Sequence, residues 1–201
     1  MIKVGLTGGI ATGKTYVLDR FRRRGVPCLD ADALAHGVEA AGTEATAAIA
    51  ARFGADVLAA DGSVDRAKLG PIVFADAAAR RDLEAIVHPA VYRAITAGLR
   101  GFEAIGGDAF AVVDVPLLFE TGAADKFDRV IVTLCPESMQ LARLAARGLS
   151  EHAARQRLAA QLPAEDKASR ADFVIRTDGS FDETNHQVDE VMSTLTGERH
   201  V

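Results

Sequence analysis

The chain has 201 residues, of which 49% are hydrophobic and 25% are charged, and its formal net charge is −5. These values are typical of a globular domain with its own core, and the acidic balance argues against broad contact with nucleic acid or anionic membranes. No apolar run reaches the ~18 residues of a membrane span, and the amino terminus leads directly into a strand pattern with no room for a signal peptide. The two cysteines, Cys28 and Cys135, lie in apolar runs and suit a reducing compartment. We therefore expect a cytoplasmic protein with no nucleic-acid or membrane partner.

Short apolar runs that alternate with helical patterns predict an α/β fold. A first strand is expected over residues 2–7, followed by a helix over residues 14–24 that stops at Gly25. The further strands are expected over residues 26–29, 110–115, 130–134 and 173–175. Strands separated by helices favour a five-stranded parallel sheet flanked by helices, with right-handed crossovers.

Two long, mostly helical stretches interrupt this predicted core. We expect an inserted helical region over about residues 33–108 and a helical lid over about 136–170. The core is then made of residues 1–32, 109–135 and 171–201. Such a layout is typical of single-domain enzymes that close over two substrates.

Two turn signals lie within the predicted insertion. The first is Ala60-Asp61-Gly62, and the second is His88-Pro89. A residue before proline is disfavoured in a helix, so we expect His88 at a turn, where it contacts the second substrate or has a structural role.

Residues 8–15 read Gly-Gly-Ile-Ala-Thr-Gly-Lys-Thr and match the phosphate-binding pattern GxxxxGK[ST] between a strand and a helix. Backbone N–H groups of such a loop and the helix N-terminus form an anion-binding concavity. Lys14 is expected to reach the β- and γ-phosphates of ATP, and the Thr15 hydroxyl to bind Mg²⁺. The residues expected to contact the nucleotide are Gly8, Gly9, Ala11, Thr12, Gly13, Lys14, Thr15 and Tyr16.

Other strings narrow the class of P-loop protein. The DxxG and NKxD elements of GTPases and the LSGGQ-like element of transport ATPases do not occur in the sequence. A small-molecule kinase is therefore the class that the size and the two helical stretches favour.

Asp30 and Asp32 follow the second predicted strand. In a parallel sheet, ligands collect at the carboxyl ends of the strands, and an aspartate there can take a proton from a hydroxyl nucleophile. Helix N-capping is the alternative for both residues. Asp114 ends the third apolar run and resembles a metal-binding aspartate, but its role and that of Glu120 stay open.

The motifs together resemble the dephospho-CoA kinase family in order and spacing over nearly the whole chain. The matching strings are GLTGGIATGKT (5–15), GVPCLDADALAH (25–36), His88-Pro89, VPLLFE (115–120) and the glutamine- and arginine-bearing stretch 140–172.

This resemblance implies that ATP phosphorylates the ribose 3′-hydroxyl of dephospho-CoA, giving coenzyme A and ADP. It also implies that Asp32 activates the acceptor hydroxyl, while Lys14 and Thr15 serve the phosphates and Mg²⁺. The chain departs from the family at Tyr16, where a small residue is usual, and at 176–179, where the family usually has Asn-x-Gly.

The predicted lid carries two arginines, Arg143 and Arg147, four residues apart, so a helix would present both on one face. Planar guanidinium groups stabilise a phosphoryl group in transfer, and we expect both arginines to act catalytically when the lid closes. A solvated helix face is the alternative for each. The other basic residues of this stretch are expected to be solvated, namely Arg155, Arg157, Lys167 and Arg170.

Two other functions stay open at this point. The chain could be a P-loop kinase of a nucleoside or nucleoside monophosphate, or a nucleotide-dependent regulatory module that hydrolyses ATP slowly or not at all. The arginine-bearing lid argues against the second. Nothing in the sequence demands more than a monomer.

Overall fold

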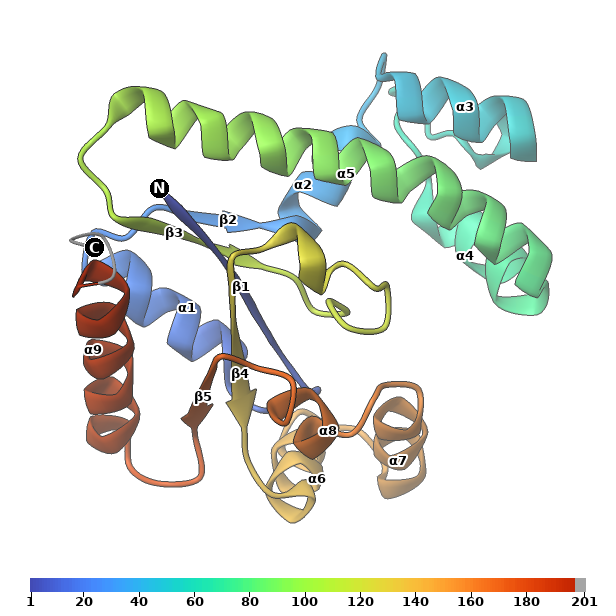
Figure 1. Cartoon of the computed structure of the whole chain (residues 1–201). Helices are drawn as coiled ribbons and strands as arrows, with labels where there is room; N and C mark the ends of the chain where they lie inside the picture. Colours follow the sequence, from blue (N-terminus) through green and yellow to red (C-terminus); the bar gives the residue numbers. More distant parts are fainter. Residues whose placement is uncertain (198–201) are drawn as a thin grey trace. The chain divides into compact units, whose positions relative to one another are not determined.

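The structure, a computed structural model, describes residues 1–197 and contains a five-stranded parallel sheet (Figure 1). The strands are β1 (Ile2–Gly8), β2 (Cys28–Asp30), β3 (Phe110–Asp114), β4 (Arg129–Leu134) and β5 (Phe173–Arg176). Their order across the sheet is β2-β3-β1-β4-β5, which makes β1 the central strand. The predicted sheet is confirmed, and each strand begins and ends within two residues of its expected bounds.

Helices connect the strands. They are α1 (Lys14–Arg23), α2 (Ala31–Val38), α3 (Glu44–Phe53), α4 (Arg66–Ala75), α5 (Ala77–Ile105), α6 (Glu137–Ala146), α7 (Glu151–Ala159), α8 (Ala164–Ala168) and α9 (Phe181–Gly197). Single 3₁₀ turns lie at Ala55–Val57 and Ala124–Lys126. Within residues 1–197, none of the helices has both the length and the apolar character needed to cross a membrane. The sequence also predicts a polar helix after about residue 182 that ends in a frayed tail; the helix is α9, and the tail beyond residue 197 lies outside the described residues.

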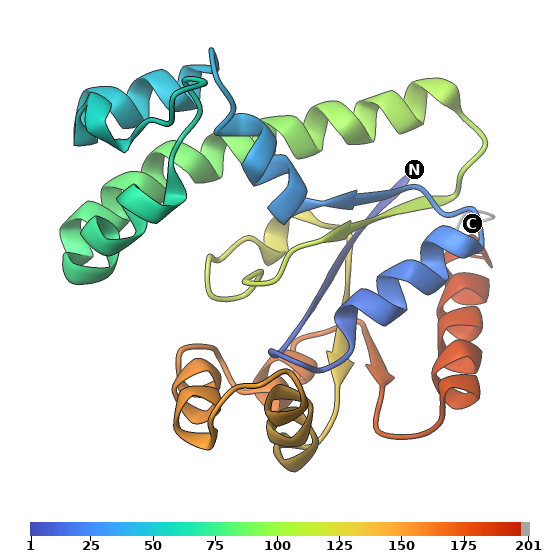
Figure 2. The same ribbon diagram turned by 180° about the vertical axis from the view of Figure 1, so that it is seen from behind.

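The chain forms two compact units, residues 1–29 with 101 onward and residues 30–100. In the first unit, α1 and α9 lie side by side over one face of the sheet (Figures 1 and 2). Phe21 of α1 and Val188 and Leu195 of α9 are fully buried against Leu6 and Ile131 of the strands. Burial of each such side chain stabilises the fold by about 1.5–3 kcal/mol, so this layer fixes the position at which β1 delivers its loop.

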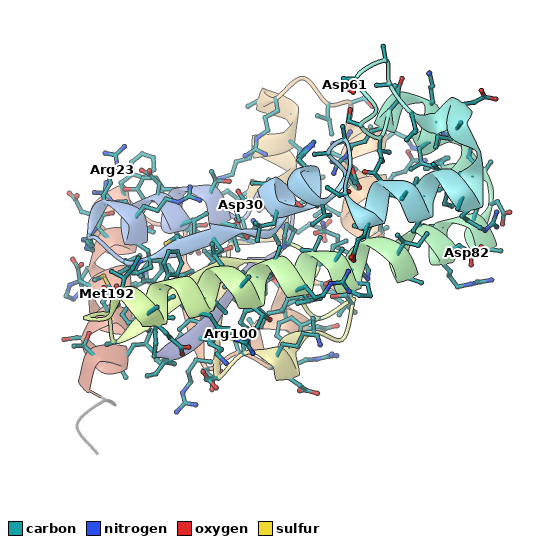
Figure 3. All side chains as sticks on the ribbon, turned by 90° about the horizontal axis from the view of Figure 1, so that it is seen from above. Arg23, Asp30, Asp61, Asp82, Arg100 and Met192 are labelled. Carbon is teal, nitrogen blue, oxygen red and sulfur yellow. The ribbon has the colours of Figure 1, made fainter. Side chains whose placement is uncertain are left out.

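The second unit consists of α2, α3, α4 and most of α5 around its own small apolar cluster. Ile49, Val57 and Leu69 are buried in that cluster, and the ion pair between Arg52 and Asp82, 2.7 Å long, links α3 to α5. Figure 3 labels Asp82 on α5 and Asp61 at the turn. The predicted turn at Asp61 is confirmed, whereas the role of this region in acceptor binding stays a prediction.

The prediction of a turn at His88-Pro89 is wrong, because both residues lie inside α5. A proline inside a helix removes one backbone donor and crowds the preceding turn, at about 3 kcal/mol. The ring of Pro89 is exposed, while Val91 and Ile95 of the same helix are buried. The packing of the apolar face of a 29-residue helix outweighs the local preference of the proline.

Candidate active site

The phosphate-binding pattern forms the loop between β1 and α1. β1 ends at Gly8 and α1 begins at Lys14, so the loop lies at the carboxyl end of the central strand. A side chain at Gly8 would collide with Thr133, and Gly13 has a φ of 88° that L side chains rarely adopt. No side chain caps the start of α1, so its first amides are available to an anion.

Gly9 and Thr12 shape the loop from within. The buried hydroxyl of Thr12 donates to the carbonyl oxygen of Gly9, 2.8 Å away, and lies 2.7 Å from the hydroxyl of Thr133 on β4. These bonds close the loop on itself and tie it to the sheet.

Lys14 and Thr15 begin α1 and differ in exposure. Lys14 forms an ion pair with Asp114 at the end of β3, and the two side chains are 18% and 8% exposed. Thr15 is exposed. Hydroxyl and carboxylate oxygens are ligands that Mg²⁺ prefers, so the residues at this edge of the sheet fit such an ion.

A cavity of about 380 Å³ lies beside the second half of the loop. Its walls carry two aromatic rings, Tyr16 and Phe181, whose centroids are 4.8 Å apart. The Tyr16 hydroxyl lies 3.0 Å from Oδ1 of Asn185 and is thereby fixed, while Phe181 at the start of α9 is 71% exposed. The ring of Tyr16 therefore lies beside the loop and forms part of the cavity wall.

Arg143 and Arg147 also line this cavity. α6 ends at Ala146 and Arg147 is its C-cap, so only Arg143 lies within the helix. Nη1 of Arg143 donates to the carbonyl oxygen of Ala11 over 3.0 Å, and Nη2 donates to that of Thr177 over 2.6 Å. Arg143 is therefore held in place, whereas Arg147 is exposed.

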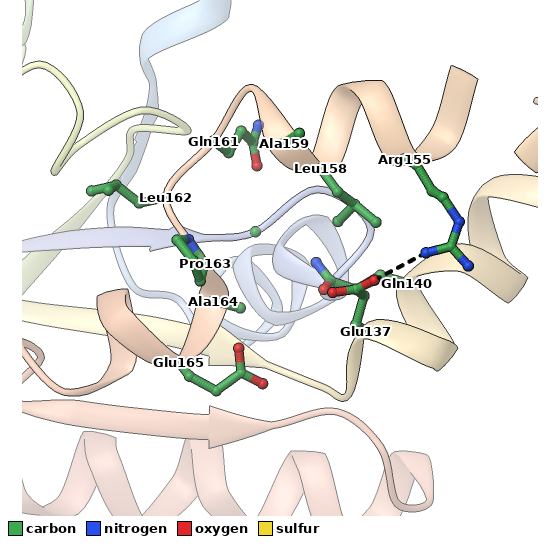
Figure 4. A pocket seen from close by; sticks show the side chains of 11 residues that line it. Glu137, Gln140, Arg155, Leu158, Ala159, Gln161, Leu162, Pro163, Ala164 and Glu165 are labelled. Atoms are coloured by element: carbon green, nitrogen blue, oxygen red, sulfur yellow. Dashed lines mark ion pairs between the residues drawn. The ribbon is translucent and has the colours of Figure 1, made fainter. Parts of the chain in front are cut away.

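Figure 4 shows a second cavity, of about 430 Å³, beside the first half of the loop. Glu137 and Glu165 contribute carboxylates to it, and its one arginine, Arg155, is paired with Glu137 over 3.6 Å. Because Arg155 is paired with Glu137, the carboxylate of Glu165 leaves this lining with a net negative charge, which repels phosphate. The charges therefore favour the cavity of Arg143 and Arg147 for a nucleotide.

The candidate acceptor residues lie in residues 30–100. Asp30, labelled in Figure 3, is the N-cap of α2 and accepts hydrogen bonds from the amides of Asp32 and Ala33 over 2.9 and 3.1 Å. Asp32 lies exposed in the first turn of α2, and His88 is half-buried in α5. Asp30 therefore has the predicted alternative role of helix N-cap, whereas the carboxylate of Asp32 is accessible.

Sequence reasoning missed several residues around the loop. Lys167 was expected to be solvated, but this is wrong, because the side chain is fully buried. Its ammonium pairs with Glu120 over 2.7 Å and donates to the carbonyl oxygen of Gly8 over 3.2 Å. A buried lysine needs such partners. A local sequence pattern cannot predict a partner that is more than forty residues away in the chain. Phe181 was missed as well, since a lone aromatic residue at a helix start carries no signal.

Comparison with known proteins gives a consistent result. A family model described as dephospho-CoA kinase matches residues 2–183. A dephospho-CoA kinase of Anaeromyxobacter dehalogenans is 48% identical over 98% of this chain and 93% of that protein. One from Geobacter metallireducens is 48% identical over 94% of each chain.

Solved structures agree in fold. A Thermus thermophilus protein superposes with a TM-score of 0.82 at 32% identity, over 98% of both chains. The dephospho-CoA kinase of Campylobacter jejuni gives 0.74 at 27% identity, again over 98% of both. A shikimate kinase from Acinetobacter baumannii, at 15% identity and a TM-score of 0.51, shares the fold alone.

Proposed function

The chain belongs to the dephospho-CoA kinase family, and from this premise we propose how its own residues carry out the reaction. The enzyme transfers the γ-phosphoryl group of ATP to the ribose 3′-hydroxyl of dephospho-CoA, giving coenzyme A and ADP in the last step of coenzyme A synthesis. The observation that carries the residue assignments is the phosphate loop beside a cavity with two arginines and two aromatic rings.

ATP is bound in two parts. Its phosphates lie in the loop of residues 8–15, against Lys14, and its purine lies in the adjoining cavity beside Tyr16 and Phe181. Aromatic rings and guanidinium groups both stack on purine faces. Arg147, which is exposed at the cavity, adds positive charge near the phosphates.

Mg²⁺ fits the loop through the Thr15 hydroxyl, with Asp114 as a second oxygen donor close to Lys14. When bound, the ion neutralises negative charge on the β- and γ-phosphates. Because Asp114 already pairs with Lys14, the carboxylate also keeps the lysine side chain next to the loop.

Asp32 orients the acceptor. Its carboxylate accepts the proton of the 3′-hydroxyl while that oxygen bonds to the γ-phosphorus, and the bond from this phosphorus to the β–γ bridging oxygen breaks to release ADP. The exposed position of Asp32 in α2 leaves its carboxylate accessible to substrate. His88 contacts the acceptor, and residues 33–108 form the acceptor-binding insertion.

Residues 136–170 act as the lid. Arg143 and Arg147 stabilise charge on the transferring group, with Arg143 acting from a fixed position. Exclusion of water by the lid prevents ATP hydrolysis in place of transfer.

We also propose that the enzyme acts as a monomer in the cytoplasm. The residues assigned to ATP come from one chain, and both cysteines are free thiols, as suits a reducing compartment. Light scattering of the purified protein tests the first point.

The deciding experiment measures ADP release with MgATP and dephospho-CoA, with AMP and adenosine as parallel acceptors and mass detection of the product. We expect one phosphoryl group to be added to dephospho-CoA alone, and the reaction to stop when Mg²⁺ is chelated. Turnover with AMP or adenosine but not with dephospho-CoA would contradict the proposed acceptor and leave only ATP use.

A further inference from the structure

Side chains hold every carbonyl group of the phosphate loop from residue 8 to residue 12. One of them, Thr12, belongs to the loop, and four come from elsewhere in the chain. The bonds are Lys167 Nζ to Gly8 O (3.2 Å), Thr12 Oγ1 to Gly9 O (2.8 Å), Gln140 Nε2 to Ile10 O (2.7 Å), Arg143 Nη1 to Ala11 O (3.0 Å) and Thr177 Oγ1 to Thr12 O (2.6 Å). We call the four outside donors, Gln140, Arg143, Lys167 and Thr177, the carbonyl clamp.

The clamp reaches the loop from three distant parts of the first unit. Gln140 and Arg143 lie on α6, Lys167 on α8, and Thr177 directly after β5. Three of these donors are buried, namely Gln140 (4% exposed), Lys167 (0%) and Thr177 (6%). Buried polar groups that lose their partner cannot turn to water. These contacts therefore persist as fixed parts of the fold.

Fixing the carbonyl groups also fixes the amides. In a planar trans peptide, the C=O of one residue and the N–H of the next point in opposite directions. Holding Ile10 O and Thr12 O in place thus also sets the directions of the amides of Ala11 and Gly13, each of which points away from the donor that holds the carbonyl before it. Neither amide donates to another residue among 1–197, so both are available to a bound anion, as the first amides of α1 are.

The loop contains a strained residue that needs such support. Ala11 has a φ of 61°, and it is the one described non-glycine residue with a positive φ. This conformation costs an L residue about 1–2 kcal/mol, and it persists only when the surroundings determine it. Arg143 holds the carbonyl of Ala11 itself, and Gln140 holds the one before it.

We infer that Gln140, Lys167 and Thr177 are positioning residues for ATP: they act on the phosphates through the orientation of the loop peptides, without touching the nucleotide. This inference rests on the proposed binding of ATP at the loop. It assigns a task to buried residues of the lid and of the segment after β5 that the transfer itself does not use. The ligand class is a polyphosphate, whatever group it carries.

Thr177 offers the sharpest test because valine has nearly its shape and lacks the hydroxyl, while serine keeps the hydroxyl. The Kd values of MgATP and of inorganic tripolyphosphate are measured by calorimetry, together with kcat, the KM of dephospho-CoA, and Tm. Thr177→Val removes the hydroxyl that donates to Thr12 O and that also accepts from Nη1 of Arg143 over 3.2 Å. We expect both Kd values to rise about 3- to 10-fold. The KM of dephospho-CoA stays within about twofold, and Thr177→Ser stays close to the parent protein.

Tripolyphosphate separates positioning from a contact with the base, since Thr177 also lines the purine cavity. Gln140→Met provides an independent variant, because Gln140 lies on the other cavity and not on this one. The same rise in both Kd values is expected there. Folded Thr177→Val and Gln140→Met proteins that bind tripolyphosphate as tightly as the parent would overturn the inference.

A rise for MgATP alone would also overturn it, since it would indicate direct contact with the nucleoside. A parent protein that binds ATP and tripolyphosphate but leaves dephospho-CoA unphosphorylated would overturn the proposed acceptor and leave the positioning inference standing. A parent protein that binds neither polyphosphate would overturn both.

Discussion

Lys14 and Asp32, on which the proposed transfer depends most, lie in surroundings of different kinds. Lys14 is held in an ion pair with a carboxylate that is only 8% exposed. Asp32 is exposed, and within residues 30–100 its side chain makes no hydrogen bond or ion pair. On the nucleotide side, groups needed for function are also part of the buried structure. On the acceptor side, function and stability rest on different residues, so substitutions should separate them.

Lys14→Ala should have the largest combined effect, because it should lower both activity and stability. Loss of a fixed positive charge at the transferring group lowers kcat/KM by about 10³-fold. The substitution also removes the ion pair with the buried carboxylate of Asp114, which should lower the unfolding free energy by about 3 kcal/mol. Steady-state kinetics and urea unfolding measure the two effects separately.

The double variant Lys14→Met with Asp114→Asn is the control that separates the effect on activity from the effect on stability. It removes both charges, so most of the stability should return while the activity stays lost. Recovery of activity along with stability would mean that Lys14 serves the fold alone.

Asp32→Asn should lower kcat by about 10²- to 10⁴-fold, the usual contribution of a general base. Its Tm should stay unchanged, since the carboxylate is exposed and the capping bonds belong to Asp30. The KM of ATP should also stay near the parent value.

Asp30→Ala is the matched opposite of that variant. It removes the N-cap of α2 and should lower the unfolding free energy by about 0.5–2 kcal/mol, with kcat within a few fold of the parent. If Asp30→Ala were the inactive variant and Asp32→Asn the unstable one, the comparison between the two regions would be reversed.

The strands and the phosphate loop could be predicted because their causes are local. Buried parallel strands are continuous apolar runs, as at β3 and β4. Gly25, with a φ of 81°, follows the end of α1, as the sequence predicts. The loop pattern needs glycine, lysine and threonine at fixed spacing, and the structure puts them between a strand and a helix.

What could not be predicted depends on residues far apart in the chain. Lys167 and Thr177 meet loop carbonyls 159 and 165 residues away, and their sequence neighbourhoods look like ordinary helix and loop. The prediction of a turn at Pro89 is wrong because the local preference of proline against helix is strong, and packing along α5 outweighs it. Local patterns thus gave the frame of the site, and tertiary contacts decide how it is held.

Phe181→Ala tests the nucleotide side at its surface, where no buried structure depends on the side chain. The ring is 71% exposed, so Tm should hardly change. Loss of stacking on the purine should raise the KM of ATP about five- to tenfold, while Phe181→Tyr keeps the parent value. Affinity for tripolyphosphate, which has no base, should not change. A fall in that affinity would move Phe181 from the purine to the phosphates.

The smallest effect is expected at the two thiols, which both lie in the first unit, Cys28 on β2 and Cys135 directly after β4. Burial raises the pKa of Cys28 to about 11, and it also raises the pKa of Cys135 despite the nearby guanidinium of Arg143. At pH 8, three units below that value, about one Cys28 thiol in a thousand is the reactive thiolate. Cys28 lies half-buried on the strand that leads to Asp30, and Cys135 is fully buried.

Iodoacetamide at pH 8 should therefore modify neither thiol of the native protein within hours, and both at once after unfolding, as mass spectrometry can follow. Raising the pH should speed the reaction of Cys28 before that of Cys135, because the half-buried thiol is reached without opening the core. Prompt labelling of Cys135 at pH 8 would show that the core beside the nucleotide site opens in solution. The nucleotide site would then not be fixed, and its contrast with the accessible Asp32 would no longer hold.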